Sequence, residues 1–185
     1  SRNRMPQWRA ATPTCAGKLT PHHLTNPTPQ HASTRLPEDS IVYFPSCASR
    51  TMGPDAHDRD QRNLPEVVCN VLMKAGYTPK FIDNMDTHCC GMPFESKGLF
   101  DAADKKLDAL NHALLKATQH GRYPIICDTS PCVFRARNKL DLRLKFYDSI
   151  EFTDKFLLPR LRITPLHDPI AIHITCSSHK QGLDD

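Results

Sequence analysis

The chain has 185 residues, which is enough for one domain with a hydrophobic core and too few for two full ones. Its formal net charge of +4 is modest, and Lys and Arg are spread along the chain, so nothing indicates a nucleic-acid-binding surface. No apolar run approaches the roughly 20 residues that span a bilayer, and no signal-peptide pattern opens the chain.

The first 38 residues are rich in proline and show neither helical nor strand periodicity. Such a composition predicts an extended linker over 1–38 that has no core of its own. Cys15 lies in this segment, and we expect it to play no part in a site.

The next elements are predicted from apolar runs and helix-ending residues. The β-rich run at 41–44 predicts a strand that stops at Pro45, two residues before Cys47. Apolar residues at helical spacing predict a helix over 63–76, with Cys69 packed in the core. A second short strand is predicted over 78–83.

A long helix is predicted from Glu95 to His120, with Gly121 ending it. Glu95 and Ser96 are interpreted as residues of its first turn. The apolar run at 123–130 predicts a third strand covered on both faces, and Pro131 opens a short helix. A fourth strand over 144–148 and a helix over 149–161 follow. Strands alternating with helices predict the α/β class, with a parallel, three-layer sheet.

The segment 88–98, HCCGMPFESKG, is the most unusual stretch of the sequence. Adjacent side chains on an extended backbone point to opposite faces, so Cys89 and Cys90 are a poor choice for two core residues. If Gly91 takes a positive φ, both sulfurs can turn toward one point. The positive charges of Lys97 and Arg50 would favour deprotonated thiols there.

Eight cysteines also allow a disulfide framework, because the number is even. Five of them, however, lie at predicted strand ends or on the glycine loop: Cys47, Cys89, Cys90, Cys127 and Cys132. This clustering favours metal or redox chemistry in a reducing compartment. We therefore predict a sulfur-ligated redox site and a cytoplasmic protein.

An internal repeat is predicted near the end of the chain. Residues 41–53, IVYFPSCASRTMG, align without a gap on residues 170–182, IAIHITCSSHKQG, with identities at Ile, Cys, Ser and Gly. Cys47 then corresponds to Cys176, at an offset of 129 residues. This match predicts a fifth strand at 170–176 that opens a second unit. The expected organisation is a linker over 1–38, one unit over 39–168 and the start of a truncated second unit over 169–185, in a fragment of a longer protein.

These motifs resemble the cysteine-rich CCG domain. The residues that carry the resemblance are YFPSCASRTMG, HCCGMPFESKG and CDTSPC, followed by a second opening at Cys176. The domain occurs in the iron–sulfur subunits of glycolate oxidase, in heterodisulfide reductase and in lactate-utilisation proteins. The likeness is strongest to the C-terminal part of FAD-linked D-lactate dehydrogenases with fused iron–sulfur domains, and it covers about residues 40–182.

The resemblance implies a Rossmann-like unit that transfers electrons within a flavin-linked lactate or glycolate dehydrogenase. Its partners would be a flavin domain or subunit, with the FAD in a part missing here, and a quinone or membrane electron acceptor. The protein could then lie on the inner face of the membrane. A fragment of this kind is not expected to be active alone. The alternative is a structural or docking domain that holds zinc or no metal.

The ligand set follows from the resemblance and from thiolate chemistry. Soft thiolates select iron–sulfur clusters, zinc or Cu(I), and four of them match the ligand number of a 4Fe-4S cluster, of the non-cubane type in this family. The expected ligands are Cys47, Cys89, Cys90 and Cys132. The family motif ends in two cysteines separated by two residues, whereas four residues separate Cys127 from Cys132 here, which leaves the role of Cys127 open.

His88 precedes the cysteine pair, and two interpretations of it stay open. It could hydrogen-bond a cluster sulfur or bind a quinone-like acceptor, or it could be a loop histidine that faces water. The sequence does not decide between a cluster, zinc and thiol chemistry without a metal.

Overall fold

The computed structural model describes residues 39–54, 57, 61–165, 167 and 169–183. The predicted linker over 1–38, including Cys15, lies outside the described residues. None of the helices in the described part is long and apolar enough to cross a membrane.

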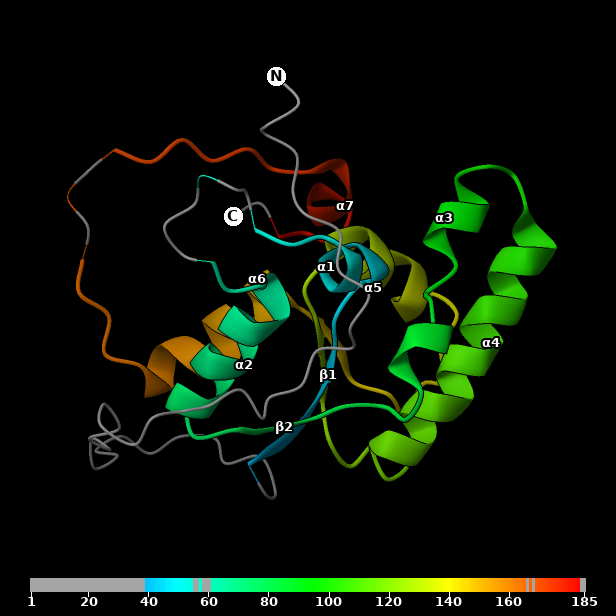
Figure 1. The fold of residues 1–185 in the computed structure, drawn as a ribbon, viewed down its shortest axis with the longest axis horizontal. Coiled ribbons are helices and arrows are strands. Elements are labelled where there is room, and N and C mark those ends of the chain that lie inside the picture. Colours follow the sequence, from blue (N-terminus) through cyan, green and yellow to red (C-terminus); the bar gives the residue numbers. More distant parts are fainter. Residues whose placement is uncertain (1–38, 55–56, 58–60, 166, 168, 184–185) are drawn as a thin grey trace.

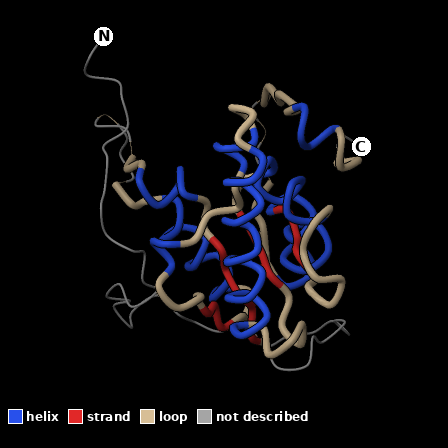
Figure 2. The backbone as a smooth tube through the Cα atoms, turned by 90° about the vertical axis from the view of Figure 1, so that its right-hand side faces the viewer, coloured by secondary structure: helices blue, strands red, loops and turns tan. Residues whose placement is uncertain are grey.

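The centre of the fold is a four-stranded sheet in which every pair of neighbours runs parallel. Its strands are β1 (Ser40–Phe44), β2 (Thr78–Lys80), β3 (Ile125–Cys127) and β4 (Phe146–Asp148), in the order β2-β1-β3-β4. The second strand, β2, pairs with one edge of β1, and the third strand, β3, pairs with its other edge, with β4 beyond it. The strand order therefore reverses between β1 and β3, within the sheet that forms the centre of the molecule (Figures 1 and 2). The predicted α/β class with a parallel sheet is confirmed.

Helices cover both faces of the sheet and make it the middle of three layers. One face carries α2 (Leu64–Lys74) and α6 (Ser149–Phe152), and α6 continues into the helical turns η4 (Thr153–Leu157) and η5 (Leu158–Arg160). The other carries α4 (Phe100–Ala117) and α5 (Ser130–Arg137) (Figure 1).

The alternation of β1 explains why two separate cores form. Val42 and Phe44 belong to the cluster beneath α4 and α5, whereas Ile41 and Tyr43 belong to the cluster beneath α2 and α6. Successive strand residues point to opposite faces, so four consecutive apolar residues fill both layers. Each of the four is at most 1% exposed.

Two helical predictions need correction. A short helix α1 (Cys47–Thr51), which the sequence did not predict, directly follows β1. The long helix begins at Phe100 rather than Glu95, because Gly98 has a φ of +75° and separates it from the one-turn helix α3 (Met92–Glu95). Glu95 therefore ends a helix, and Ser96 is its C-cap. A further helical turn, η3 (Met85–Thr87), lies between β2 and the cysteine pair.

The predicted fifth strand is wrong, because residues 170–175 form no strand and lead directly into the short helix α7 (Cys176–His179). A strand exists only through hydrogen bonds to a neighbour, and the described residues supply no neighbour at this position. Ile170, Ile172 and Ile174 are consequently 70%, 84% and 45% exposed.

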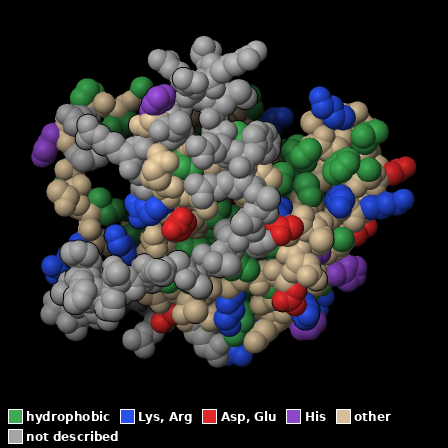
Figure 3. Space-filling model, in the orientation of Figure 1, with side chains coloured by type: hydrophobic (Ala, Val, Ile, Leu, Met, Phe, Trp, Pro, Cys, Tyr) green, Lys and Arg blue, Asp and Glu red, His purple; other side chains and the backbone are tan. Residues whose placement is uncertain are grey.

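Apolar side chains also gather on the surface over α3 and the start of α4 (Figure 3). Leu99 and Phe100 are the large ones there, 55% and 61% exposed.

Candidate thiol site

Five cysteines from four chain segments meet at the carboxyl edge of the sheet. Cys47 opens α1 just after β1, Cys127 ends β3, and Cys132 lies in the first turn of α5. Cys89 and Cys90 end the connection from β2. The site therefore lies beside the switch point between β1 and β3, where doubly wound sheets bind ligands. The predicted placement of Cys47 and Cys90 at the same edge is confirmed.

The sulfur atoms form a chain of neighbours. Cys90 Sγ donates a hydrogen bond to Cys132 Sγ over 3.1 Å. On one side of this pair Cys132 interacts with Cys127, and on the other Cys90 interacts with Cys89, which interacts with Cys47. All five are free thiols. The inner members are buried, whereas Cys47 and Cys89 are partly exposed.

Gly91 explains how the two adjacent cysteines can face one site. Its φ of +85° is the positive value predicted from the sequence, and its backbone N–H donates to Cys89 Sγ over 3.4 Å. A Cβ atom at this position would lie 2.3 Å from the carbonyl oxygen of Ala103 in α4. Only glycine fits, because both the backbone conformation and the close approach of α4 exclude a side chain.

Arg50 on α1 fixes the loop that leads into the cysteine pair. It is 8% exposed, and its guanidinium donates to the carbonyl oxygens of Met85 at 2.5 Å and His88 at 2.7 Å. A longer bond of 3.4 Å reaches the carbonyl of Ser46. The rigid fork of an arginine can bridge three carbonyls in this way, so Arg50 holds the segment of Cys47 against the segment of Cys89.

Asp128, which directly follows β3, is hydrogen-bonded to the end of β1 and so holds these two strand ends together. The sequence interpretation did not identify it. Its carboxylate accepts a hydrogen bond from Tyr43 Oη at 2.7 Å and another from the backbone N–H of Ser46 at 2.9 Å. The available signal was its position, because it directly follows Cys127 at the predicted carboxyl end of a strand. Burial and the nearby carboxylate of Asp128 raise the pKa of Tyr43, so its hydroxyl stays a donor.

Electrostatics distinguish Cys89 from the other thiols. Hydrogen bonds from Cys47 and Cys90 lower its pKa, and the Gly91 N–H and the Arg50 charge act in the same direction. The pKa values of Cys47 and Cys90 are raised, first by hydrogen bonds to neighbouring sulfurs and then by burial. Burial also raises the pKa of Cys127. The site can thus hold one thiolate, at Cys89, surrounded by thiols that donate to sulfur.

His88 is partly buried beside the same loop. Its Nδ1 is buried and has no hydrogen-bond partner, while its backbone carbonyl is held by Arg50. Desolvation and the charges of Arg50 and Lys106 lower its pKa, which favours the neutral imidazole. An unpartnered ring nitrogen fits a residue that contacts a bound group. Lys97, expected to offset thiolate charge, is exposed.

Two further cysteines of the described part lie outside this group. Cys69 packs in the core beneath α2, as predicted, but it is disulfide-bonded and therefore not a free thiol. The sequence interpretation expected a core residue only and missed this bond. Cys176 is free and exposed at the start of α7.

The donor set fits a soft metal or an iron–sulfur cluster in type and number. Among the residues the structure describes, however, no group of three or more His, Cys, Asp or Glu side chains is arranged to hold a metal ion. Cys47 interacts electrostatically with Cys90 and Cys132 as well as with Cys89, so the sulfurs are gathered in one region.

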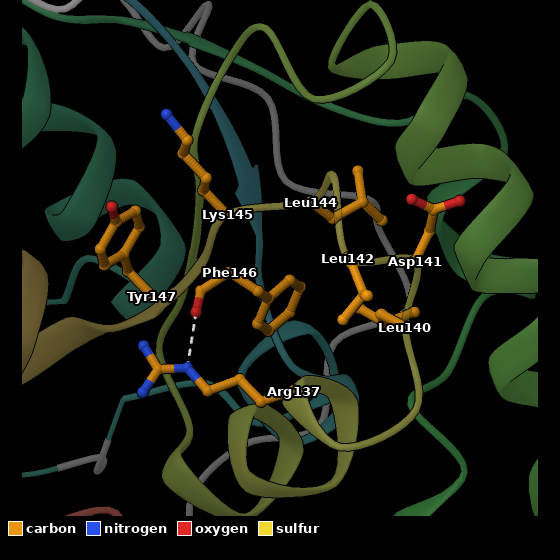
Figure 4. A pocket seen from close by; sticks show the side chains of 8 residues that line it. All are labelled: Arg137, Leu140, Asp141, Leu142, Leu144, Lys145, Phe146 and Tyr147. Carbon is orange, nitrogen blue, oxygen red and sulfur yellow. Dashed lines mark hydrogen bonds between the residues drawn. The ribbon is translucent and has the colours of Figure 1, made fainter.

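The described part also contains a surface pocket of about 260 Å³, which is separate from the thiols. Its lining comes from the end of α5, the following loop and β4, and Arg137 Nε donates to the carbonyl of Phe146 across it at 2.8 Å (Figure 4). None of the five cysteines lines it. We therefore place the candidate site at the thiols.

No family model, curated protein or solved structure matches the chain, so the assignment of a site here depends on its geometry.

Proposed function

We propose that this unit is an electron-transfer module in which Cys47, Cys89, Cys90 and Cys132 hold an iron–sulfur cluster. The observation that carries the proposal is the gathering of five free thiols at the ligand-binding edge of a parallel sheet. Four thiolates are the ligand number of an ordinary cluster, and the cluster would supply one-electron transfer when bound.

The chain's own residues support this function by holding the thiols in place. Gly91 lets the adjacent cysteines approach α4, Arg50 ties their loop to α1, and Asp128 ties β1 to β3. Arg50 also contributes positive charge next to Cys89, which favours a thiolate ligand. Cys127 is fully buried and hydrogen-bonded to Cys132, and it would support the site without being an obligatory ligand.

The sequence resemblance supports a specific setting for the module. It would accept electrons from an FAD-bearing domain that oxidises lactate, glycolate or another 2-hydroxy acid, and deliver them to a quinone or membrane acceptor. His88 is the residue we assign to a contact with the cluster or the acceptor, because its buried Nδ1 lacks a partner. This setting places the unit on the inner face of the membrane.

Anaerobic reconstitution with iron and sulfide tests the proposal. The protein should turn brown and bind iron and sulfide, and Cys90→Ser should lose most of the iron because an iron site is left open. Cys127→Ser should lose only part of it. Cys176→Ser is the matched control, since Cys176 is a free thiol outside the group, and it should retain the iron.

A different metal content would contradict electron transfer. If the protein instead holds one zinc and no iron, and Cys90→Ser releases that zinc, the unit is a structural zinc domain. If neither metal binds under reducing conditions, the site is not a metal site.

A further inference from the structure

Cys90 and Cys132 are in direct sulfur–sulfur contact in the described part of the chain. The two Sγ atoms are 3.1 Å apart, and the residues are 1% and 6% exposed. They come from separate elements, the loop before α3 and the first turn of α5. Neither sulfur is committed to a disulfide.

The backbone around Cys90 is held on two sides. Gly91, its neighbour, lies against the Ala103 carbonyl in α4, and the preceding His88 carbonyl accepts a hydrogen bond from Arg50. Cys90 itself packs in the core beneath α4 and α5. The loop therefore presents this sulfur to α5 in a fixed position.

The other side of the contact is held by ion pairs between a buried arginine and two partly exposed carboxylates. Arg135 lies on α5 one turn after Cys132 and is 3% exposed. It pairs with Glu95 at the end of α3 at 2.5 Å and with Asp104 in α4 at 2.7 Å. These pairs join α5 to both helices that follow the cysteine loop, so Cys132 is kept close to Cys90.

We propose that Cys90 and Cys132 are a redox-active dithiol, which closes to a disulfide when a peroxide-class oxidant reaches the site. The sulfur–sulfur bond forms as both S–H bonds break, and the two electrons and two protons pass to the peroxide. Its O–O bond breaks, and hydrogen peroxide leaves as two water molecules whereas an alkyl hydroperoxide leaves as one water and one alcohol, so the step balances. Of the two residues Cys132 is the more exposed, at 6% against 1%, so the oxidant would have to reach the pair from its side.

Closure has a consequence for the proposed function. A disulfide would remove two of the four expected ligands, so the oxidised chain would not load a cluster until a thiol reductant reopened it. The dithiol itself needs no metal, and only this consequence rests on the proposed function. A reversible disulfide would also keep both sulfurs from irreversible oxidation.

Mass spectrometry of the metal-free chain, with the five clustered thiols reduced and the Cys69 disulfide left intact, tests the dithiol directly. Equimolar hydrogen peroxide should lower the intact mass by two hydrogen atoms. Digestion should then yield one new linked species, absent before oxidation, that joins peptide 81–97 to peptide 123–135, and fragmentation should locate the bond at Cys90 and Cys132. Dithiothreitol should reverse it. Because fragmentation assigns the bond in the unaltered protein, the test does not depend on any variant folding.

Matched variants sharpen the assignment. Cys90→Ser and Cys132→Ser should each abolish the link, while Cys176→Ser should leave it unchanged. A bond between Cys89 and Cys47, a bond through Cys127, or sulfinic acid without any link would overturn the proposal.

Metal content separates this inference from the proposed function. The oxidised protein should lose most of its capacity for iron and recover it after reduction. If the disulfide forms but the reduced protein binds no metal, the proposed function fails and the dithiol stands. If metal binds but no link between Cys90 and Cys132 appears, the dithiol fails and the proposed function stands.

Discussion

The two short helices α1 and α7 begin in the same way but end up in different surroundings. Ser46 caps α1 by accepting the Ser49 N–H at 3.1 Å, and Thr175 caps α7 by accepting the Ser178 N–H at 3.2 Å. In each helix the cap is followed at once by a cysteine, and the cap hydroxyl also contacts the hydroxyl of the same serine. These pairs lie at the aligned positions of the repeat.

The segments that precede α1 and α7 differ. β1, before α1, is paired on both sides, whereas residues 170–175, before α7, are exposed and unpaired with any described strand. Cys47 joins the thiol group, and Cys176 remains exposed. α7 instead packs on α5, where Ser178 Oγ lies 3.2 Å from Ser130 Oγ. A helix cap is therefore specified by a few local residues, while a strand and a cysteine site require partners from distant parts of the chain.

The largest expected difference concerns a glycine in each region. Gly91→Ala should lower the free energy of unfolding by about 3 to 5 kcal/mol, because the added Cβ would meet the Ala103 carbonyl at 2.3 Å. Gly182, which follows α7, has a φ of +67° but nothing within 4 Å of a Cβ. Gly182→Ala should therefore cost only about 1 kcal/mol. Urea denaturation measures both, and equal effects would contradict the close approach at Gly91.

The next difference in stability concerns Arg50 and His179, each of which lies four residues after its helix cap. Arg50→Ala should destabilise the protein by about 3 kcal/mol, because the carbonyls of Met85 and His88 lose a buried donor. His179→Ala should change stability by less than about 0.5 kcal/mol, since the residue is exposed.

The same substitution should also change the chemistry of the loop. Arg50→Ala should raise the pKa of Cys89, because one of the groups that lower it is lost. Alkylation of Cys89, followed by peptide mapping against pH, should then shift to higher pH. A loss of stability with no such shift would show that Arg50 acts on packing alone.

This comparison also shows how far the sequence could be interpreted. Apolar runs located the four strands of the sheet, although β2 and β3 are shorter than predicted, because burial on both faces of a parallel sheet leaves a local signature, as at 41–44 and 125–127. The positive φ of Gly91 followed from two adjacent cysteines that had to share a site.

Other features had no local signature. Arg50 and Asp128 act through partners 35 and 85 residues away in the chain, so their roles depend on the completed fold. The same reason explains the wrong strand at 170–176. Its pattern matches β1, but a strand pattern without neighbours remains an exposed segment.

Removing the two caps should produce a smaller difference. Ser46→Ala should cost about 1 to 2 kcal/mol in global stability, because Ser46 is 1% exposed and α1 leads directly from the central strand. Thr175→Ala should cost about 1 kcal/mol locally. Hydrogen exchange should show faster exchange of the α7 amides in Thr175→Ala with little change in the urea midpoint. A global loss of stability in that variant would mean that α7 is part of the cooperative core.

The smallest effect on stability is expected from the segment before α7. Ile172 is 84% exposed, so Ile172→Lys should leave the urea midpoint within about 0.5 kcal/mol of the original. The same change should reduce self-association, because Ile170, Ile172 and Ile174 expose apolar side chains on an unpaired extended segment. Sedimentation velocity over a range of concentrations would measure it. Val42→Lys is the opposite case, because Val42 is fully buried in β1, the strand that aligns with this segment, and the substitution should prevent folding. If Ile172→Lys destabilised the protein as a core substitution does, residues 170–175 would be packed in solution, and the contrast between the two repeats would disappear.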